Sequence, residues 1–321
     1  MLSVCREISP EQKEMRAVFA ECMDELAQND KRVVYLDCDL MNSIGMTGFS
    51  KKYPAQTINC GIQEANMIGA AAGMSAAGLI PFVHTFGPFA TRRVMDQVFV
   101  SAAYARLNLK IIGSDPGVTA SLNGGTHMPF EDLAVMRSIP EVTVIEPTDS
   151  VMLADILRQV KDLYGVFYIR LSRKISQHIY GEGTAFSIGK GIQLCGGTDA
   201  AIIASGICVA EALFARDILE KEGIHTRVIN IFTIKPIDRE IIIKAAAETG
   251  VLVTAENHNI INGLGSAVAE VLSENYPVPM ERIGIKDRFG EVGTEQYLKE
   301  KFGLTAQDIA AAVKRAIQRK K

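Results

Sequence analysis

Apolar runs separated by helical patterns dominate the first half of this chain. The runs lack the alternation of a half-exposed strand, and they cover residues 32–37, 57–59, 79–84, 109–113, 143–145 and 166–171. Helical spacing predicts helices over 10–29, from 64 onward, and over 92–107, 130–138 and 149–164. Buried strands alternating with helices are typical of a parallel sheet covered on both faces. We therefore predict a doubly wound α/β domain over residues 1–175.

A second alternating set follows a polar, glycine-containing stretch. Residues 176–190 are predicted to be a linker. Beyond them, strands are expected at 200–205, 226–231 and 251–256, with helices at 208–222, 238–249, 263–275 and from 305. The pattern predicts a second, smaller doubly wound α/β domain over residues 191–321. The length of 321 residues agrees with this division, because single cores stop growing near about 250–300 residues.

Charge and composition exclude several classes of function. The net charge is −3, and lysines and arginines are scattered without a basic stripe, which argues against a nucleic-acid partner. The most apolar window, 67–83, is rich in Ala and Gly and contains Pro81, so no membrane partner is expected. The N-terminus lacks a signal-peptide pattern. Six cysteines without CxxC or metal-ligand spacing predict buried free thiols, a cytoplasmic location and no metal site on this chain.

One carboxylate and two aromatic rings form the leading candidate site. Glu64 begins a helix of small residues, and Phe86 and Phe89 follow the next strand at its carboxyl end, where open α/β sheets bind ligands. Together they could hold a flat heteroaromatic cofactor with a basic ring nitrogen, such as the aminopyrimidine of thiamine diphosphate. The alternatives are that Glu64 only opposes the helix dipole and that the rings belong to the core.

Further candidates lie on loops. His127 follows Gly124-Gly125 in a long irregular loop over 114–127, and it could transfer protons or be a structural histidine in a turn. Arg173 follows a strand and Arg16 lies early in the first helix; their guanidinium groups suit a phosphate or a sulfonate, although Arg16 could be a solvated surface charge. Residues 256–259 (ENHN) end a predicted strand of the second domain, where a structural polar turn is expected, the alternative being a second active site. No P-loop is present, and Gly-Leu-Gly at 263–265 is only a fragment of a dinucleotide fingerprint.

Several motifs taken together resemble the transketolase family. They are NCGIQEANM, TFGPF, GGTHMPFEDLAVMRSIP, IEPTD and IRLSR. The resemblance covers essentially the whole chain but only the second half of a full transketolase, namely the pyrimidine-binding and C-terminal domains. It implies the C-terminal subunit of a split transketolase, which uses thiamine diphosphate to transfer a two-carbon ketol unit between sugar phosphates.

The resemblance also implies roles for the candidates. Glu64 matches the catalytic glutamate that hydrogen-bonds the aminopyrimidine nitrogen, and His127 matches a histidine that assists proton transfer in the substrate channel. The pyrimidine would pack on Phe86 and Phe89, with Asp39 near the cofactor. The remaining matches concern the substrate phosphate, which would lie near Ser43, Arg173 and Arg16.

The part of the family that holds the cofactor's diphosphate is missing from this chain. The resemblance places the Gly-Asp-Gly motif and the Mg²⁺ or Ca²⁺ that it binds in an N-terminal partner subunit. It therefore implies an active site at the interface, with a homodimer of this chain inside a two-plus-two assembly.

Three positions depart from ordinary transketolases. Asp115 stands where they have a histidine and Asn123 where they have an aspartate, and both positions line the substrate channel. Arg92, expected near the cofactor, replaces a tyrosine of some members. These changes alter which hydroxyl pattern is satisfied, so the substrate could be apulose 4-phosphate or a sulfosugar. The alternatives are the beta subunit of a 2-oxo acid dehydrogenase, a regulatory subunit that kept the fold, and a flavodoxin-like binding module.

Overall fold

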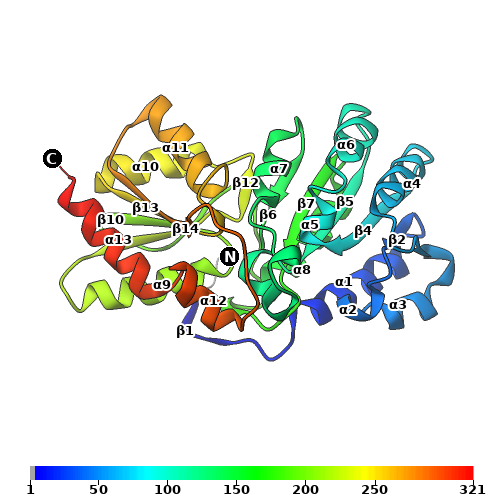
Figure 1. Ribbon diagram of the computed structural model, residues 1–321, viewed down its shortest axis with the longest axis horizontal. Coiled ribbons are helices and arrows are strands. Elements are labelled where there is room, and N and C mark those ends of the chain that lie inside the picture. Colours follow the sequence, from blue (N-terminus) through cyan, green and yellow to red (C-terminus); the bar gives the residue numbers. More distant parts are fainter. Residues whose placement is uncertain (1–3, 321) are drawn as a thin grey trace.

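Two α/β units lie side by side in the computed structural model, which describes residues 4–320 (Figure 1). The first unit runs from blue to green in the figure and the second from yellow-green to red. The outer ends of the predicted domains, at residues 1–3 and 321, lie outside the described residues.

The first unit is built on a seven-stranded sheet in the order β12-β6-β7-β5-β4-β2-β3. Six strands from the first half of the chain pair in parallel, as predicted. They are β2 (Val33–Asp37), β3 (Thr57–Asn59), β4 (Ile80–Phe86), β5 (Leu109–Ser114), β6 (Thr143–Ile145) and β7 (Val166–Leu171). The edge strand β12 (Thr233–Lys235) comes from the second half of the chain and pairs antiparallel with β6. The two units therefore share a sheet.

Both faces of this sheet are covered, because neighbouring residues of one strand enter different cores. Tyr35 packs in one cluster with residues of α1 (Met15–Asn29) and α8 (Ser150–Asp162). Leu36 packs in the other with residues of α4 (Glu64–Ala76) and α7 (Asp132–Ser138). Short helices α2 (Met41–Ile44), α3 (Thr47–Lys52), α5 (Gly87–Ala90) and α6 (Met95–Gln97) follow strands at their carboxyl ends.

The second unit has a five-stranded sheet in the order β14-β13-β10-β11-β9. Its strands are β9 (Ile192–Cys195), β10 (Ala200–Ala204), β11 (Thr226–Asn230), β13 (Leu252–Asn259) and β14 (Met280–Ile285). All neighbours pair in parallel except β9 with β11. The helices are α9 (Cys208–Glu220), α10 (Arg239–Thr249), α11 (Leu264–Asn275), α12 (Glu295–Phe302) and α13 (Ala306–Gln318). The predicted mixed α/β class with parallel sheets is confirmed.

Several local predictions were wrong. The helix expected over 92–107 is broken into α6 and a π-helical turn over Val98–Tyr104, and no described contact accounts for the wider turn. The helix expected from residue 10 begins at Met15, because residues 4–10 form β1 (Val4–Pro10). That strand pairs antiparallel with β8 (Gln177–Tyr180), which lies inside the predicted linker. The polar turn expected at 256–259 is instead the buried end of β13.

The loop over 114–127 is compact. It contains two 3-10 turns, Gly117–Asn123 and Gly125–His127, and its first part is buried against the second unit. The side chain of Asn257 on β13 accepts a hydrogen bond from the Val118 amide and donates one to the Pro116 carbonyl, both at 2.9 Å. A strand of the second unit thus fixes a loop of the first. In the described part of the chain, no helix has the length and apolar character needed to cross a membrane.

Candidate active site

A buried carboxylate faces a stacked cation at the start of α4. Glu64 is only 4% exposed, and its Oε1 accepts a hydrogen bond of 2.7 Å from Nη1 of Arg93. The guanidinium carbon of Arg93 lies 3.9 Å from the centre of the Phe89 ring. Carboxylate and aromatic face therefore already hold one planar, delocalised cation. This arrangement fits the protonated aminopyrimidine of thiamine diphosphate, which would need the same two contacts.

Three rings of the predicted site come together. The His127 ring lies 5.2 Å from Phe89 and 5.8 Å from Phe86, edge to face in both cases, and the two phenylalanines are 6.5 Å apart. A nitrogen of His127 is 2.9 Å from Oγ1 of Thr126. No hydrogen bond to the other ring nitrogen is found among residues 4–320, which leaves that nitrogen free to exchange a proton with a ligand.

Arginines gather at the other end of the same group. Arg173 covers the Phe86 ring at 4.9 Å and hydrogen-bonds the hydroxyl of Ser43. Nη1 of Arg16 donates to the Ser43 carbonyl at 3.0 Å, so both guanidinium groups converge on the start of α2. Glu14 pairs with Arg16 at 2.6 Å. The predicted anion-binding residues are therefore neighbours, and they adjoin the aromatic group.

Asp115 joins this arginine end. Its Oδ2 accepts a hydrogen bond of 2.8 Å from Nε of Arg173 and lies 3.5 Å from Nδ2 of Asn123. The residue is 1% exposed and has a left-handed backbone with φ of 57°. Its second oxygen, Oδ1, is buried without a hydrogen-bond partner among the described residues. A buried, unpaired acceptor is unfavourable, so Oδ1 has the capacity for one further hydrogen bond.

Two predicted residues are not brought into this group by any described contact. Asp39 exchanges hydrogen bonds with Asn59 at 3.1 Å and is exposed. Arg92 pairs with Glu131 at 2.5 Å and donates to the Thr126 carbonyl, so it anchors the segment beside His127. Asp39 nevertheless follows β2, at the same edge of the sheet as the rest of the site.

Sequence reasoning missed the hydrogen-bonded support beneath the site. His84 bridges the carboxylate of Asp37 at 2.9 Å and the hydroxyl of Ser114 at 3.0 Å, and all three are fully buried. These residues lie on β2, β4 and β5, so the hydrogen bonds fix how the carboxyl ends of these three strands are placed relative to one another. Arg93 was also missed. Its spacing of four residues from Phe89 is the one signal that could have suggested contact.

A buried ionic cluster ties the two units together behind the site. Arg170 donates to both oxygens of Asp132 at 2.7 and 2.8 Å, to Glu146 at 2.6 Å and to the Asn257 carbonyl at 3.0 Å. Burial alone would raise the pKa of Asp132, but the adjacent Arg170 charge holds it below its usual value. Burial lowers the pKa of the neighbouring His258 to about 4. The low pKa keeps His258 neutral near pH 7, beside the ion pair of Arg170 and Asp132.

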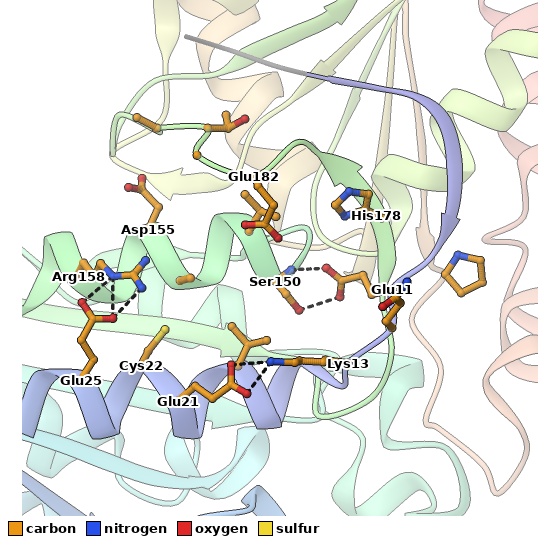
Figure 2. Close-up of a pocket in the computed structure, with 18 of the residues that line it drawn as sticks. Glu11, Lys13, Glu21, Cys22, Glu25, Ser150, Asp155, Arg158, His178 and Glu182 are labelled. Atoms are coloured by element: carbon orange, nitrogen blue, oxygen red, sulfur yellow. Dashed lines mark hydrogen bonds and ion pairs between the residues drawn. The ribbon is translucent and has the colours of Figure 1, made fainter.

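A cavity of about 840 Å³ lies elsewhere, between α1, α8 and residues 182–185 (Figure 2). None of the predicted site residues lines it. Glu11, Asp149 and His178 place possible metal ligands within 4.8 Å of one another there. Both oxygens of Glu11 already accept hydrogen bonds from Ser150, and those of Asp149 accept backbone amides of α8 and β8. The hydrogen bonds of Glu11 and Asp149 therefore hold the segment before α1, the start of α8 and β8 together, which explains the two acids without a metal ion.

Comparisons with known proteins agree with this geometry. The family model described as transketolase, pyrimidine binding domain, matches residues 11–177, and transketolase, C-terminal domain, matches residues 189–309. The chain is 50% identical to "6-deoxy-6-sulfo-D-fructose transketolase subunit SqwH" of Clostridium sp. (strain MSTE9), over 98% of each chain. It is 36% identical to one of the subunits of an apulose-4-phosphate transketolase of Phocaeicola vulgatus, over 92% of this chain and 94% of the relative.

A solved structure is similar over its full length. It is described as "Split gene transketolase, inactive beta4 tetramer", with a TM-score of 0.87 and 40% identity over 96% of this chain and 99% of that one. These matches favour transketolase over the 2-oxo acid dehydrogenase alternative. Membership of this family implies thiamine diphosphate as the cofactor. The chain therefore belongs to the transketolase family, as the C-terminal subunit of a split transketolase.

Proposed function

We propose that this chain supplies the pyrimidine half of a thiamine-diphosphate site, and that an N-terminal subunit supplies the diphosphate half with its Mg²⁺ or Ca²⁺. The observation that carries the proposal is the buried Glu64 carboxylate beside the Phe89 face, already occupied by a planar cation. Residues 1–175 would form the pyrimidine domain, 176–190 the linker and 191–321 the C-terminal domain. Six free cysteines agree with the cytoplasm as the predicted location.

When bound, the cofactor supplies a carbanion that accepts and releases a two-carbon ketol unit. In our proposal Glu64 holds a proton at the pyrimidine ring nitrogen, and Phe86 and Phe89 exclude water from the ring. His127 exchanges a proton with the sugar oxygen that gains or loses charge. Asp39 and Arg92 would act from the edge of the cofactor site.

The charge at the arginine end favours a singly charged substrate tail. Arg16 and Arg173 bring two positive charges to Ser43, but Glu14 and Asp115 bring two negative charges to the same arginines. An anion therefore meets a site of no net charge, where attraction to the arginines and repulsion from the acids largely offset each other. A dianionic phosphate costs more to remove from water than a monoanionic sulfonate does, and a site without net charge does not compensate for that cost. Together with the 50% identical relative, this supports a sulfosugar, the 6-deoxy-6-sulfofructose type, as donor.

Asn123 and the unpaired Oδ1 of Asp115 would select the hydroxyl pattern of the sugar. Apulose 4-phosphate is the alternative that the 36% identical relative raises, and its phosphate makes it the less suitable substrate on charge. We propose a two-plus-two assembly, in which copies of this chain meet through α4. In support, Gly69 and Gly73 on that helix have no described atom within 4 Å of an added Cβ, so a second backbone could approach closely.

Reconstitution tests the proposal. This chain is mixed with its N-terminal subunit, thiamine diphosphate and Mg²⁺, and two-carbon transfer from 6-deoxy-6-sulfofructose and from fructose 6-phosphate is compared. We expect kcat/KM to be at least about tenfold higher for the sulfonate, since the dianionic phosphate costs more to desolvate in a site without net charge. Asp115→Asn should narrow the gap. Equal rates on both sugars would remove the charge argument, and full activity of Glu64→Gln would remove the assignment of Glu64.

A further inference from the structure

Arg93 already occupies the position that the proposed function gives to the cofactor ring. Its guanidinium makes one hydrogen bond to the buried Glu64 carboxylate, at 2.7 Å, and lies over the Phe89 ring at 3.9 Å. Those are the two contacts by which the pyrimidine would be held. A pyrimidine that uses the same carboxylate oxygen and the same ring face would compete with Arg93 for them.

The two groups are chemically alike. A guanidinium is planar and delocalised, carries one positive charge, and presents N–H donors in one plane. A 4-aminopyrimidine protonated on a ring nitrogen is also planar and delocalised, carries one positive charge, and presents a ring N–H donor at its edge. Each suits a carboxylate at its edge and an aromatic ring at its face. Arg93 is therefore a chemical mimic of the cofactor ring.

Exposure differs between the partners in a way that allows exchange. The Glu64 side chain is 4% exposed, whereas that of Arg93 is 44% exposed. The adjacent Arg92 is tied to Glu131 and to the Thr126 carbonyl, but the side-chain hydrogen bond found for Arg93 among the described residues is the one to Glu64. Arg93 can therefore swing into solvent while Glu64 stays in place.

We propose that Arg93 is a displaceable internal cation, which closes the pyrimidine half of the site and must leave when the cofactor enters. The inference rests on the proposed function, because it assumes that Glu64 and Phe89 bind the ring. It gives Arg93 a regulatory role. In the site without cofactor, Arg93 keeps the buried Glu64 carboxylate paired. Because the cofactor must displace Arg93, the affinity for thiamine diphosphate is lower than that of the same site without Arg93.

Calorimetric titration of the reconstituted complex with thiamine diphosphate at saturating Mg²⁺ tests this role. Arg93→Gln removes the competing cation. The dissociation constant of this variant for thiamine diphosphate should fall by roughly five- to tenfold, because one half-exposed ion pair and one cation–π contact no longer compete with the cofactor. Arg93→Lys keeps the charge but loses the planar guanidinium, so its dissociation constant for thiamine diphosphate should lie between those of the wild type and of Arg93→Gln. Arg239→Gln removes an exposed pair with Glu274 in the second unit and should leave the constant unchanged.

A supporting role for Arg93 predicts the opposite sign. If Arg93 holds Glu64 in its working position, Arg93→Gln weakens cofactor binding and lowers kcat, and our inference is overturned. Unchanged binding in both Arg93 variants would overturn it as well. Glu64→Gln distinguishes the proposal about Arg93 from the proposed function. If Glu64→Gln loses affinity for the cofactor and Arg93→Gln does not gain affinity, the proposal about Arg93 fails and the proposed function stands. Wild-type affinity in Glu64→Gln removes the site itself.

Discussion

Replacing Asn257 should loosen the active-site loop from the second unit. Its side chain lies fully buried on β13 and pairs with the Pro116 carbonyl and the Val118 amide. Gly117 between them has φ of 52°, and a Cβ there would lie 2.1 Å from Oδ1 of Asn257. Asn257→Ala removes both hydrogen bonds and leaves the buried Val118 amide unpaired, while the Pro116 carbonyl keeps the hydrogen bonds that it accepts from the amide and the hydroxyl of Thr119. About 2 kcal/mol for the unpaired amide and about 1 kcal/mol for the other lost hydrogen bond give a total of about 3 kcal/mol.

Part of that energy should appear as lost catalysis, because the loop continues to Asp115 on one side and His127 on the other. A loss of about 1.4–3 kcal/mol in transition-state binding is roughly a ten- to hundredfold fall in kcat/KM. Hydrogen exchange of residues 115–127 and urea unfolding measure the loop and the stability. Asn275→Ala, which removes a bond from an exposed residue to the Val271 carbonyl, is the control, with an expected change below about 0.5 kcal/mol. Normal exchange and normal kcat/KM in Asn257→Ala would refute this reasoning.

Three further changes follow from the same structure. Burial holds the pKa of His258 at about 4, against 6.5 when unfolded, so the unfolded chain binds more protons between these two pH values. Lowering the pH from 8 to 5 should therefore reduce the unfolding free energy of the wild type by about 2 kcal/mol more than that of His258→Gln. The exposed His225→Gln variant should keep the pH dependence of the wild type, and the loss of that dependence in His225→Gln would contradict this expectation. Arg170→Met removes the positive charge that faces the buried carboxylates of Asp132 and Glu146, which keep only neutral hydrogen-bond donors such as Tyr168 and Ser205. It should lower the unfolding free energy by about 3–5 kcal/mol in urea titrations, and a loss below about 1 kcal/mol would show that the two acids are not both buried and charged. Arg173→Gln should raise KM about tenfold or more for an anionic ketose but not for uncharged erythrulose, and equal effects on both would place the anion elsewhere.

The sheet strands of both units could be predicted from sequence because their buried apolar runs carry the fold locally. Val33 to Asp37 and Val166 to Leu171 are buried at every position, which is what a run without alternation predicts. Strands β1, β8 and β12 could not be found this way. They are short or polar, and each depends on a partner far away in the chain.

Some contacts of the candidate site could likewise be predicted from sequence, and others could not. The grouping of Phe86, Phe89 and His127, and of Arg16, Arg173 and Ser43, could be expected from strand ends and from the family resemblance. The contact of Arg93 with Glu64 could not, because it depends on the direction of a side chain after a broken helix. The hold of Asn257 on the loop joins residues about 140 positions apart, a separation that reflects packing between units and that no local pattern reveals.

If two polypeptides share the cofactor site, neither chain alone should bind thiamine diphosphate tightly. Thiamine diphosphate with Mg²⁺ is titrated calorimetrically into this chain alone, into the N-terminal subunit alone and into their equimolar mixture, with ketol transfer measured on the same samples. We expect tight binding and turnover in the mixture only, with one cofactor for each pair of chains. Tight binding and ketol transfer by this chain alone would show that the site is not shared.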